Sequence, residues 1–176
     1  MLTGLRLLVV FILFVSLPSF TPAVGKEKVK WMALNDVEGA VREQKKPVLI
    51  DLYTDWCGWC KVMDRKTYSN KKVVAYLSEK YYSVKVDAES KSPLTWAGKT
   101  FHFNSGYKTN DFALYLTQGR LSYPTTVILP ADGSSPVAVP GYLTPSELEL
   151  FVRYFGDGHY GRKTFQEYRH SFKSTW

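Results

Sequence analysis

A six-residue run dense in apolar residues, 48–53, restricts the fold of this 176-residue chain more than any other feature. Pro47 precedes it, and as a strand it would place apolar side chains on both faces. A strand buried on both faces is typical of the centre of an α/β sheet covered by helices. The sequence therefore predicts an α/β fold built around this strand.

The segments on either side alternate between helical and extended patterns. Asn35 or Asp36 can cap a first helix that ends near Gln44, whereas Asn70 and Thr144 have side chains suited to capping two later ones. We expect further helices from about 58, over 71–79 and over 145–154, and further strands over 81–87, 125–129 and 137–139.

Two regions extend this outline. The segment from about 89 to 121 is long for a connection, and only 111–117 has a helical pattern. Its aromatic residues are Trp96, Phe101, Phe103, Tyr107, Phe112 and Tyr115. They predict either a satellite core formed by this insert itself or an aromatic wall that selects protein partners. The tail, about 160–176, predicts a helix docked on the body, because 165, 168 and 172 are aromatic at helical spacing.

The first 25 residues have the pattern of a signal peptide. Arg6 precedes the eleven-residue apolar run 7–17, and small residues end at Gly25. The run is shorter than the roughly 18 residues that span a bilayer, so a permanent anchor is the alternative. Cleavage after Gly25 would leave 26–176 as one exported domain, in a compartment where disulfides persist.

The two cysteines, Cys57 and Cys60, lie three positions apart at the start of a predicted helix. Unpaired N–H groups at a helix N-terminus favour a thiolate, which makes Cys57 the nucleophile. Cys60, one turn further on, is sheltered and resolves the mixed disulfide. Zinc would need two further ligands, and the three histidines show no metal-binding spacing. The pattern predicts a reversible disulfide with no metal and no cofactor.

The stretch 47–63 resembles the thioredoxin family. It is similar to the thioredoxin-like C-terminal domain of the periplasmic disulfide reductase DsbD and to stand-alone exported thioredoxin-like proteins. The resemblance covers 48–87 and resumes at 123–126, but the insert and the tail depart from it. It implies an α/β thioredoxin fold, a central mixed sheet flanked by helices, with an insert before the cis-proline strand and a C-terminal helical extension.

The resemblance assigns roles to individual residues. Asp51 matches the buried carboxylate that accepts a proton from the resolving cysteine, and burial would raise its pKa. Pro124 matches the cis-proline that faces the disulfide. The expected binding platform for a partner peptide consists of Trp56, Gly58, Trp59, Tyr123 and Pro124.

One position departs from the family pattern. Ser83 stands four residues before Asp87, where many thioredoxins keep a lysine beside the buried carboxylate. This difference predicts that Asp51 lacks its usual counter-charge. Because Asp51 and Asp55 oppose a thiolate and Lys61 is the only close cation, we expect a reducing potential nearer roughly −270 mV than −120 mV.

The sequence therefore predicts an exported thiol:disulfide oxidoreductase that reduces disulfides of envelope proteins, with a membrane or periplasmic electron donor. The alternative is a protein-binding adaptor or chaperone-like module that uses the aromatic insert without redox turnover. The net charge of +7 permits attraction to nucleic acid, but the basic residues are scattered and export removes the chain from most nucleic acid. Membrane contact is expected only if the signal segment stays uncleaved.

Overall fold

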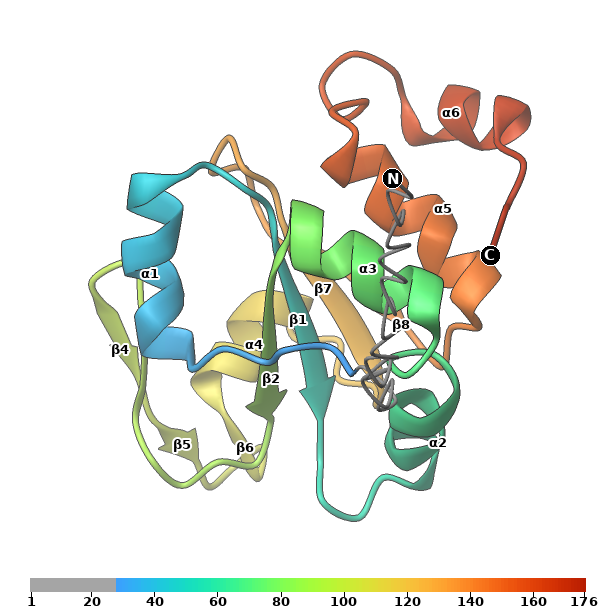
Figure 1. Ribbon diagram of the computed structural model, residues 1–176. Coiled ribbons are helices and arrows are strands. Elements are labelled where there is room, and N and C mark those ends of the chain that lie inside the picture. Colours follow the sequence, from blue (N-terminus) through green and yellow to red (C-terminus); the bar gives the residue numbers. More distant parts are fainter. Residues whose placement is uncertain (1–27) are drawn as a thin grey trace, which may run out of the picture.

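The computed structural model describes residues 28–176 (Figure 1). The predicted signal peptide, 1–25, lies outside the described residues. In chain order the elements are α1 (Leu34–Glu43), β1 (Val48–Tyr53), α2 (Gly58–Lys66), α3 (Lys71–Lys80), β2 (Tyr82–Asp87), β3 (Leu94–Trp96), β4 (Lys99–Phe101), β5 (Phe103–Asn104), β6 (Thr109–Asn110), α4 (Asp111–Thr117), β7 (Thr125–Leu129), β8 (Val137–Pro140), α5 (Pro145–Gly156) and α6 (Phe165–Ser171).

The main sheet has the strand order β2-β1-β7-β8. Strand β1 runs parallel to β2 and antiparallel to β7, and β8 runs antiparallel to β7. The sheet is therefore mixed, with β1 in its interior, as the sequence predicts for 48–53. A parallel bridge from Met32 to Val84 adds a short contact at the β2 edge.

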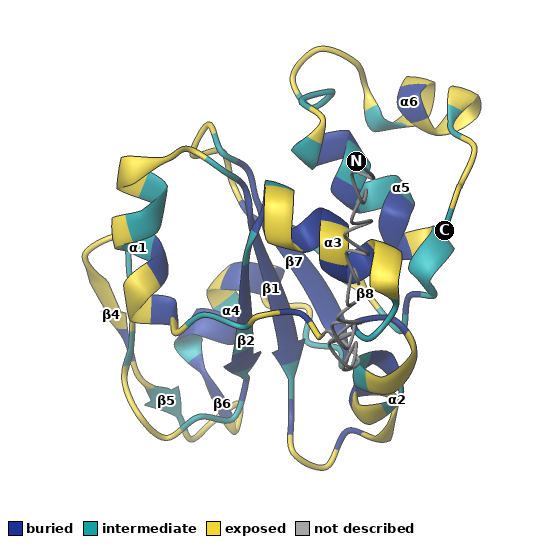
Figure 2. Cartoon of the chain, viewed as in Figure 1, coloured by how far each residue is buried: buried dark blue, intermediate teal, exposed yellow. Residues whose placement is uncertain are grey.

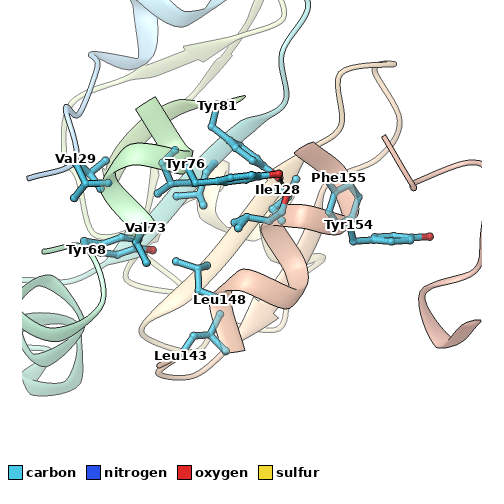
Figure 3. Packing of buried hydrophobic residues seen from close by; sticks show 14 of the residues in the cluster. Val29, Tyr68, Val73, Tyr76, Tyr81, Ile128, Leu143, Leu148, Tyr154 and Phe155 are labelled. Carbon is cyan, nitrogen blue, oxygen red and sulfur yellow. Dashed lines mark hydrogen bonds between the residues drawn. The ribbon is translucent and has the colours of Figure 1, made fainter. Parts of the chain in front are cut away.

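Helices cover both faces of this sheet, so the core has two parts. On one face Leu49 and Ile128 pack against α2, α3 and α5, and Figure 3 shows Ile128 among the aromatic side chains there. On the other face Ile50 and Val127 pack against α1 and α4. Figure 2 shows β1 buried along its length between these layers. Because side chains alternate along a strand, Asp51 shares the face of Leu49.

The capping predictions hold for two helices and fail for a third. The Asn70 side chain accepts from two N–H groups at the start of α3, and Thr144 forms a capping box with Glu147 at the start of α5. Helix α1, by contrast, has Ala33 as its N-cap, without a side-chain hydrogen bond. The expected caps at 35 and 36 are inside the helix. Met32 N–H, two residues before the helix, donates to Ser83 O at 2.8 Å, so the segment before α1 is attached to β2.

The insert contains β3 to β6 and α4, and the predicted helix over 111–117 is confirmed. The four short strands escaped sequence reasoning. Phe101 and Phe112 are buried, but they belong to the core on the α1 and α4 face of the main sheet. The satellite-core interpretation is therefore wrong for these two residues, whereas Tyr107 is 67% exposed.

The tail forms the expected docked helix. Tyr168 of α6 is buried, and Phe165 stacks on Phe151 of α5 with ring centroids 5.2 Å apart. Beyond α6 the chain returns to α5 (Figure 1). Among residues 28–176, no helix is both long enough and apolar enough to cross a membrane.

The returning tail is held by Glu149, a buried carboxylate in α5. Its oxygens accept from Ser174 Oγ at 2.6 Å, from the Thr175 N–H and hydroxyl at 2.7 Å each, and from Trp176 N–H at 3.1 Å. Arg153 Nε donates to the same carboxylate at 2.8 Å. Burial raises the pKa of Glu149, but these hydrogen bonds outweigh it and lower the pKa to about 2.

Candidate redox-active site

The site begins at the N-terminus of α2, where β1 ends. Cys57 is the N-cap of the helix, and its Sγ accepts from Cys60 N–H at 3.0 Å. The two cysteines form a disulfide, with Cα atoms 5.3 Å apart. The predicted pairing and the placement of Cys57 at the helix start are therefore confirmed. The helix dipole and the free N–H groups of α2 favour negative charge at Cys57 once the disulfide is reduced.

In this oxidised form the two cysteines are almost equally covered, with Cys57 4% and Cys60 3% exposed. The expected difference in their exposure is absent here. Gly58 is exposed, and a Cβ built on it would meet nothing within 4 Å. The surface next to the disulfide is therefore open to an approaching chain at Gly58.

Asp51 lies beneath the site on β1 and is 1% exposed. Among the described residues, the polar group that contacts its carboxylate is the Lys85 ammonium, 3.2 Å from Oδ2. Burial raises the pKa of Asp51 to about 6, and the charge of Lys85 limits the rise. A carboxyl with this pKa can exchange a proton near neutral pH.

The prediction that Asp51 lacks a counter-charge is wrong. Lys85 Nζ lies 3.2 Å from Asp51 Oδ2 and donates to both oxygens of Asp64 on α2, at 2.6 and 2.7 Å. Asp51 and Lys85 are directly paired residues of the parallel strands β1 and β2. The lysine beside Asp51 therefore comes two residues before Asp87, not four residues before it at Ser83. Lys61 is consequently not the only cation near the site.

Lys85 also connects Asp51 to the resolving cysteine. Burial lowers the pKa of Lys85, but the hydrogen bond to Asp64 and the charge of Asp51 outweigh it, so the pKa is raised. Lys85, Asp64 and Cys60 together line a cavity of about 250 Å³. The ammonium group therefore stays protonated and lies between two carboxylates beside Cys60.

Aromatic side chains flank the disulfide. Trp56 is 66% exposed and contacts Tyr123 edge-on, with ring centroids 5.9 Å apart. Trp59 is 62% exposed, and its ring centroid lies 5.5 Å from that of Tyr142. The Tyr123–Pro124 peptide bond is cis, as the resemblance implies. Trp56 is thus held against the loop before β7 and Trp59 against the loop after β8, and the binding platform itself stays a prediction.

Sequence reasoning missed four residues at this site: Asp64, Lys85, Glu89 and Tyr142. Asp64 lies seven residues after Cys57, which is two helical turns along the same face, and this spacing was the available signal. Lys85 alternates with buried residues of β2, but its partner depends on strand register. Glu89 and Tyr142 lie in loops that the sequence pattern does not place.

Within residues 28–176, no three His, Cys, Asp or Glu side chains gather as metal ligands would. The fold and the paired cysteines define a thioredoxin-fold protein with a redox-capable disulfide at a helix N-terminus. The family model Thioredox_DsbH, described as "Protein of unknown function, DUF255", matches residues 18–155. The chain belongs to this family.

The chain is also similar to individual proteins. It is 27% identical over 142 residues to "Protein disulfide-isomerase C17H9.14c" of Schizosaccharomyces pombe, covering 79% of this chain and 33% of that protein. It is 34% identical over 65 residues to "Thiol:disulfide interchange protein DsbD" of Pectobacterium atrosepticum, covering 32% of this chain and 11% of that protein. The chain spans a third or less of the length of the curated relatives it matches.

Among solved structures, the chain is similar to a "DsbH Oxidoreductase". The TM-score is 0.54 at 14% identity, and the match covers 81% of this chain and 94% of the other. This likeness confirms the thioredoxin fold that the sequence predicts.

Proposed function

We propose that the protein is an exported thiol:disulfide oxidoreductase that reduces disulfides in envelope proteins. The observation that carries the proposal is the Cys57–Cys60 disulfide at the start of α2, the helix that follows the strand of buried Asp51. Relatives named as disulfide isomerase and thiol:disulfide interchange protein support the same chemistry. The apolar run 7–17, followed by small residues, supports export.

The reaction starts from the reduced pair. The Cys57 thiolate attacks one sulfur of a partner disulfide, which forms a mixed disulfide and releases the first partner thiolate. Cys60 then loses its thiol proton and attacks Cys57 Sγ. That attack releases the second partner thiolate and restores the Cys57–Cys60 disulfide. Two electrons pass to the partner, and a dithiol donor of the envelope must return them.

Asp51 is the proton acceptor for Cys60 in this scheme. Its pKa of about 6 keeps most of it ionised at neutral pH, and Lys85 contacts only its Oδ2, at 3.2 Å. Lys85 forms ion pairs with both Asp51 and Asp64 and lines the same cavity as Cys60. Polar groups therefore lead from Asp51 to the half-exposed Asp64 carboxylate, where the accepted proton can reach solvent. Both carboxylates also disfavour ionisation of the Cys60 thiol before it attacks.

The direction of electron flow follows from these charges. A strongly oxidising pair needs its thiolate stabilised by nearby positive charge. Here Lys85 is paired with two carboxylates, and Asp55 is a further exposed acid beside the site. Stabilisation of the thiolate then depends on the helix N-terminus, and we expect a potential nearer roughly −270 mV than −120 mV.

Trapping and equilibration test the proposal. Cys60→Ser should accumulate mixed disulfides with envelope proteins, whereas Cys57→Ser should accumulate none. Equilibration of the pair with glutathione buffers measures the potential, and a value above about −170 mV would exclude the reductive direction. A protein adaptor, the alternative, would keep its partners in the Cys57→Ser variant.

A further inference from the structure

Glu89 links the segment after β2 to the aromatic residue beside Cys57. Its Oε1 accepts from the Trp56 indole N–H at 3.1 Å, across 33 positions of sequence. Tyr123 contacts the same indole edge-on. Two independent contacts thus hold a side chain that is otherwise mostly exposed, so its free face is presented in one orientation.

The backbone at Glu89 is itself fixed. Ala88 N–H donates to Tyr53 O at 2.8 Å, at the end of β1, and Ala88 O accepts from Asn110 N–H at 2.6 Å. The Glu89 N–H donates to an oxygen of Asp87 at 3.0 Å. These bonds join the backbone next to Glu89 to the end of β1 on one side and to Asn110, just before α4, on the other.

Asn110 extends this connection into the core. Its side-chain oxygen accepts from Phe112 N–H at 3.0 Å, which caps α4, and its amide donates to Ser90 O and Ser92 O. Phe112 is fully buried against the sheet. The acceptor offered to Trp56 is therefore attached to a packed helix rather than to a free loop.

We propose that Glu89 is a positioning residue for partner binding, through which the insert 89–121 holds the Trp56 indole ready to contact the chain around a partner's cysteine. The inference rests on the proposed disulfide exchange. A side chain ordered before binding loses less conformational entropy when the partner arrives, which strengthens binding without changing the reacting sulfurs. The occupant of this surface is an extended segment of a disulfide-containing protein that lies against the free face of the indole.

The first experiment compares two disulfides as substrates. Insulin supplies a protein disulfide, and bis(2-hydroxyethyl) disulfide is too small to need the indole. For Glu89→Ala we expect KM for insulin to rise about three- to tenfold, with kcat and the rate with the small disulfide unchanged. Glu89→Gln keeps an oxygen acceptor and should behave as wild type. Glu79→Ala, which removes an exposed glutamate from α3, is the matched control.

A second pair of measurements tests the hydrogen bond from the other side. Trp56→Phe keeps an aromatic ring but cannot donate, and it should raise KM for insulin on its own. Adding Glu89→Ala to Trp56→Phe should then have no further effect, because the bond is already absent. Relaxation of the Trp56 indole ¹⁵N should show a rigid ring in wild type and Glu89→Gln, and a mobile ring in Glu89→Ala.

The outcomes separate this inference from the proposed function. If wild type reduces both disulfides but Glu89→Ala matches it in KM and in indole relaxation, the positioning role is wrong and the oxidoreductase stands. Equal damage in Glu89→Gln and Glu89→Ala would also overturn it, since charge rather than hydrogen bonding would then matter. If wild type reduces neither disulfide, the proposed function itself fails.

Discussion

Replacing Asp51 by asparagine should stabilise the protein at alkaline pH, although the same change removes the proposed proton acceptor. Asparagine has nearly the shape of the protonated carboxyl and never carries the charge. Asp51 is 1% exposed, and the polar contact that its oxygens make among the described residues is with Lys85 Nζ, 3.2 Å from Oδ2. The native state therefore contains a carboxylate whose burial is only partly offset by Lys85.

The size of the effect follows from the pKa. The carboxyl has a pKa of about 6 in the folded protein, against an ordinary value of 3.8. At about 1.4 kcal/mol per pKa unit, ionising Asp51 costs the native state about 3 kcal/mol. The folded protein keeps this proton up to about pH 6 while the unfolded chain has released it. Stability from this group is consequently highest below about pH 4 and falls as the pH rises through 6.

Urea unfolding of the oxidised wild type and Asp51→Asn at pH 4, 6 and 8 measures this difference directly. We expect the variant to be more stable by about 3 kcal/mol at pH 8 and by less than about 0.5 kcal/mol at pH 4. Taking the difference between variants cancels the titration of other carboxylates. Asp55→Asn, a change at an exposed site in the loop that follows β1, is the control. A difference that does not depend on pH, or a variant less stable at pH 8, would refute the reasoning.

Three further predictions follow from the site and the tail. Lys85→Met removes the charge that lowers the pKa of Asp51, so the turnover–pH profile should move to higher pH; an unmoved profile would disconnect Lys85 from the proton transfer. Glu149→Ala should cost about 3 kcal/mol in urea unfolding at pH 7, because the pKa drop from 4.5 to about 2 measures what the carboxylate gains from its donors. This cost should disappear as the pH falls from 4.5 towards 2, and a cost below about 0.5 kcal/mol at pH 7 would contradict the tail contacts. After reduction, alkylation should label Cys57 before Cys60, and the reverse order would exchange their roles.

Local chemistry explains why much of the fold was predictable. The strand 48–53 is apolar on both faces, and an interior strand of a covered sheet has that composition. Asn70 and Thr144 cap helices through bonds to N–H groups two or three residues away, so short sequence windows contain the whole interaction. The cysteine pair is equally local, because helix geometry alone brings positions 57 and 60 together.

The remaining features depend on contacts between distant segments. Lys85 meets Asp51 because two strands pair in one particular register, and a shift of one residue would turn the lysine to the opposite face. The strands of the insert pair locally, β3 with β4 across the turn at 97–98 and β5 with β6, but two- and three-residue strands are too short to show a periodicity in the sequence. The hydrogen bond between Glu89 and Trp56 forms only when the packing of α4 and β1 has placed both residues.

The hydrogen bonds to Glu149 extend the packed part of the protein beyond the region that the family model matches. The family model stops at residue 155, whereas four of the hydrogen bonds to the buried carboxylate come from 174–176. A chain trimmed at residue 155 would keep the Arg153 ion pair but lose the four hydrogen bonds that 174–176 donate to the buried carboxylate. For recombinant work, truncation points within 174–176 are therefore best avoided, since contacts to α5 come from about twenty residues past the end of the family match.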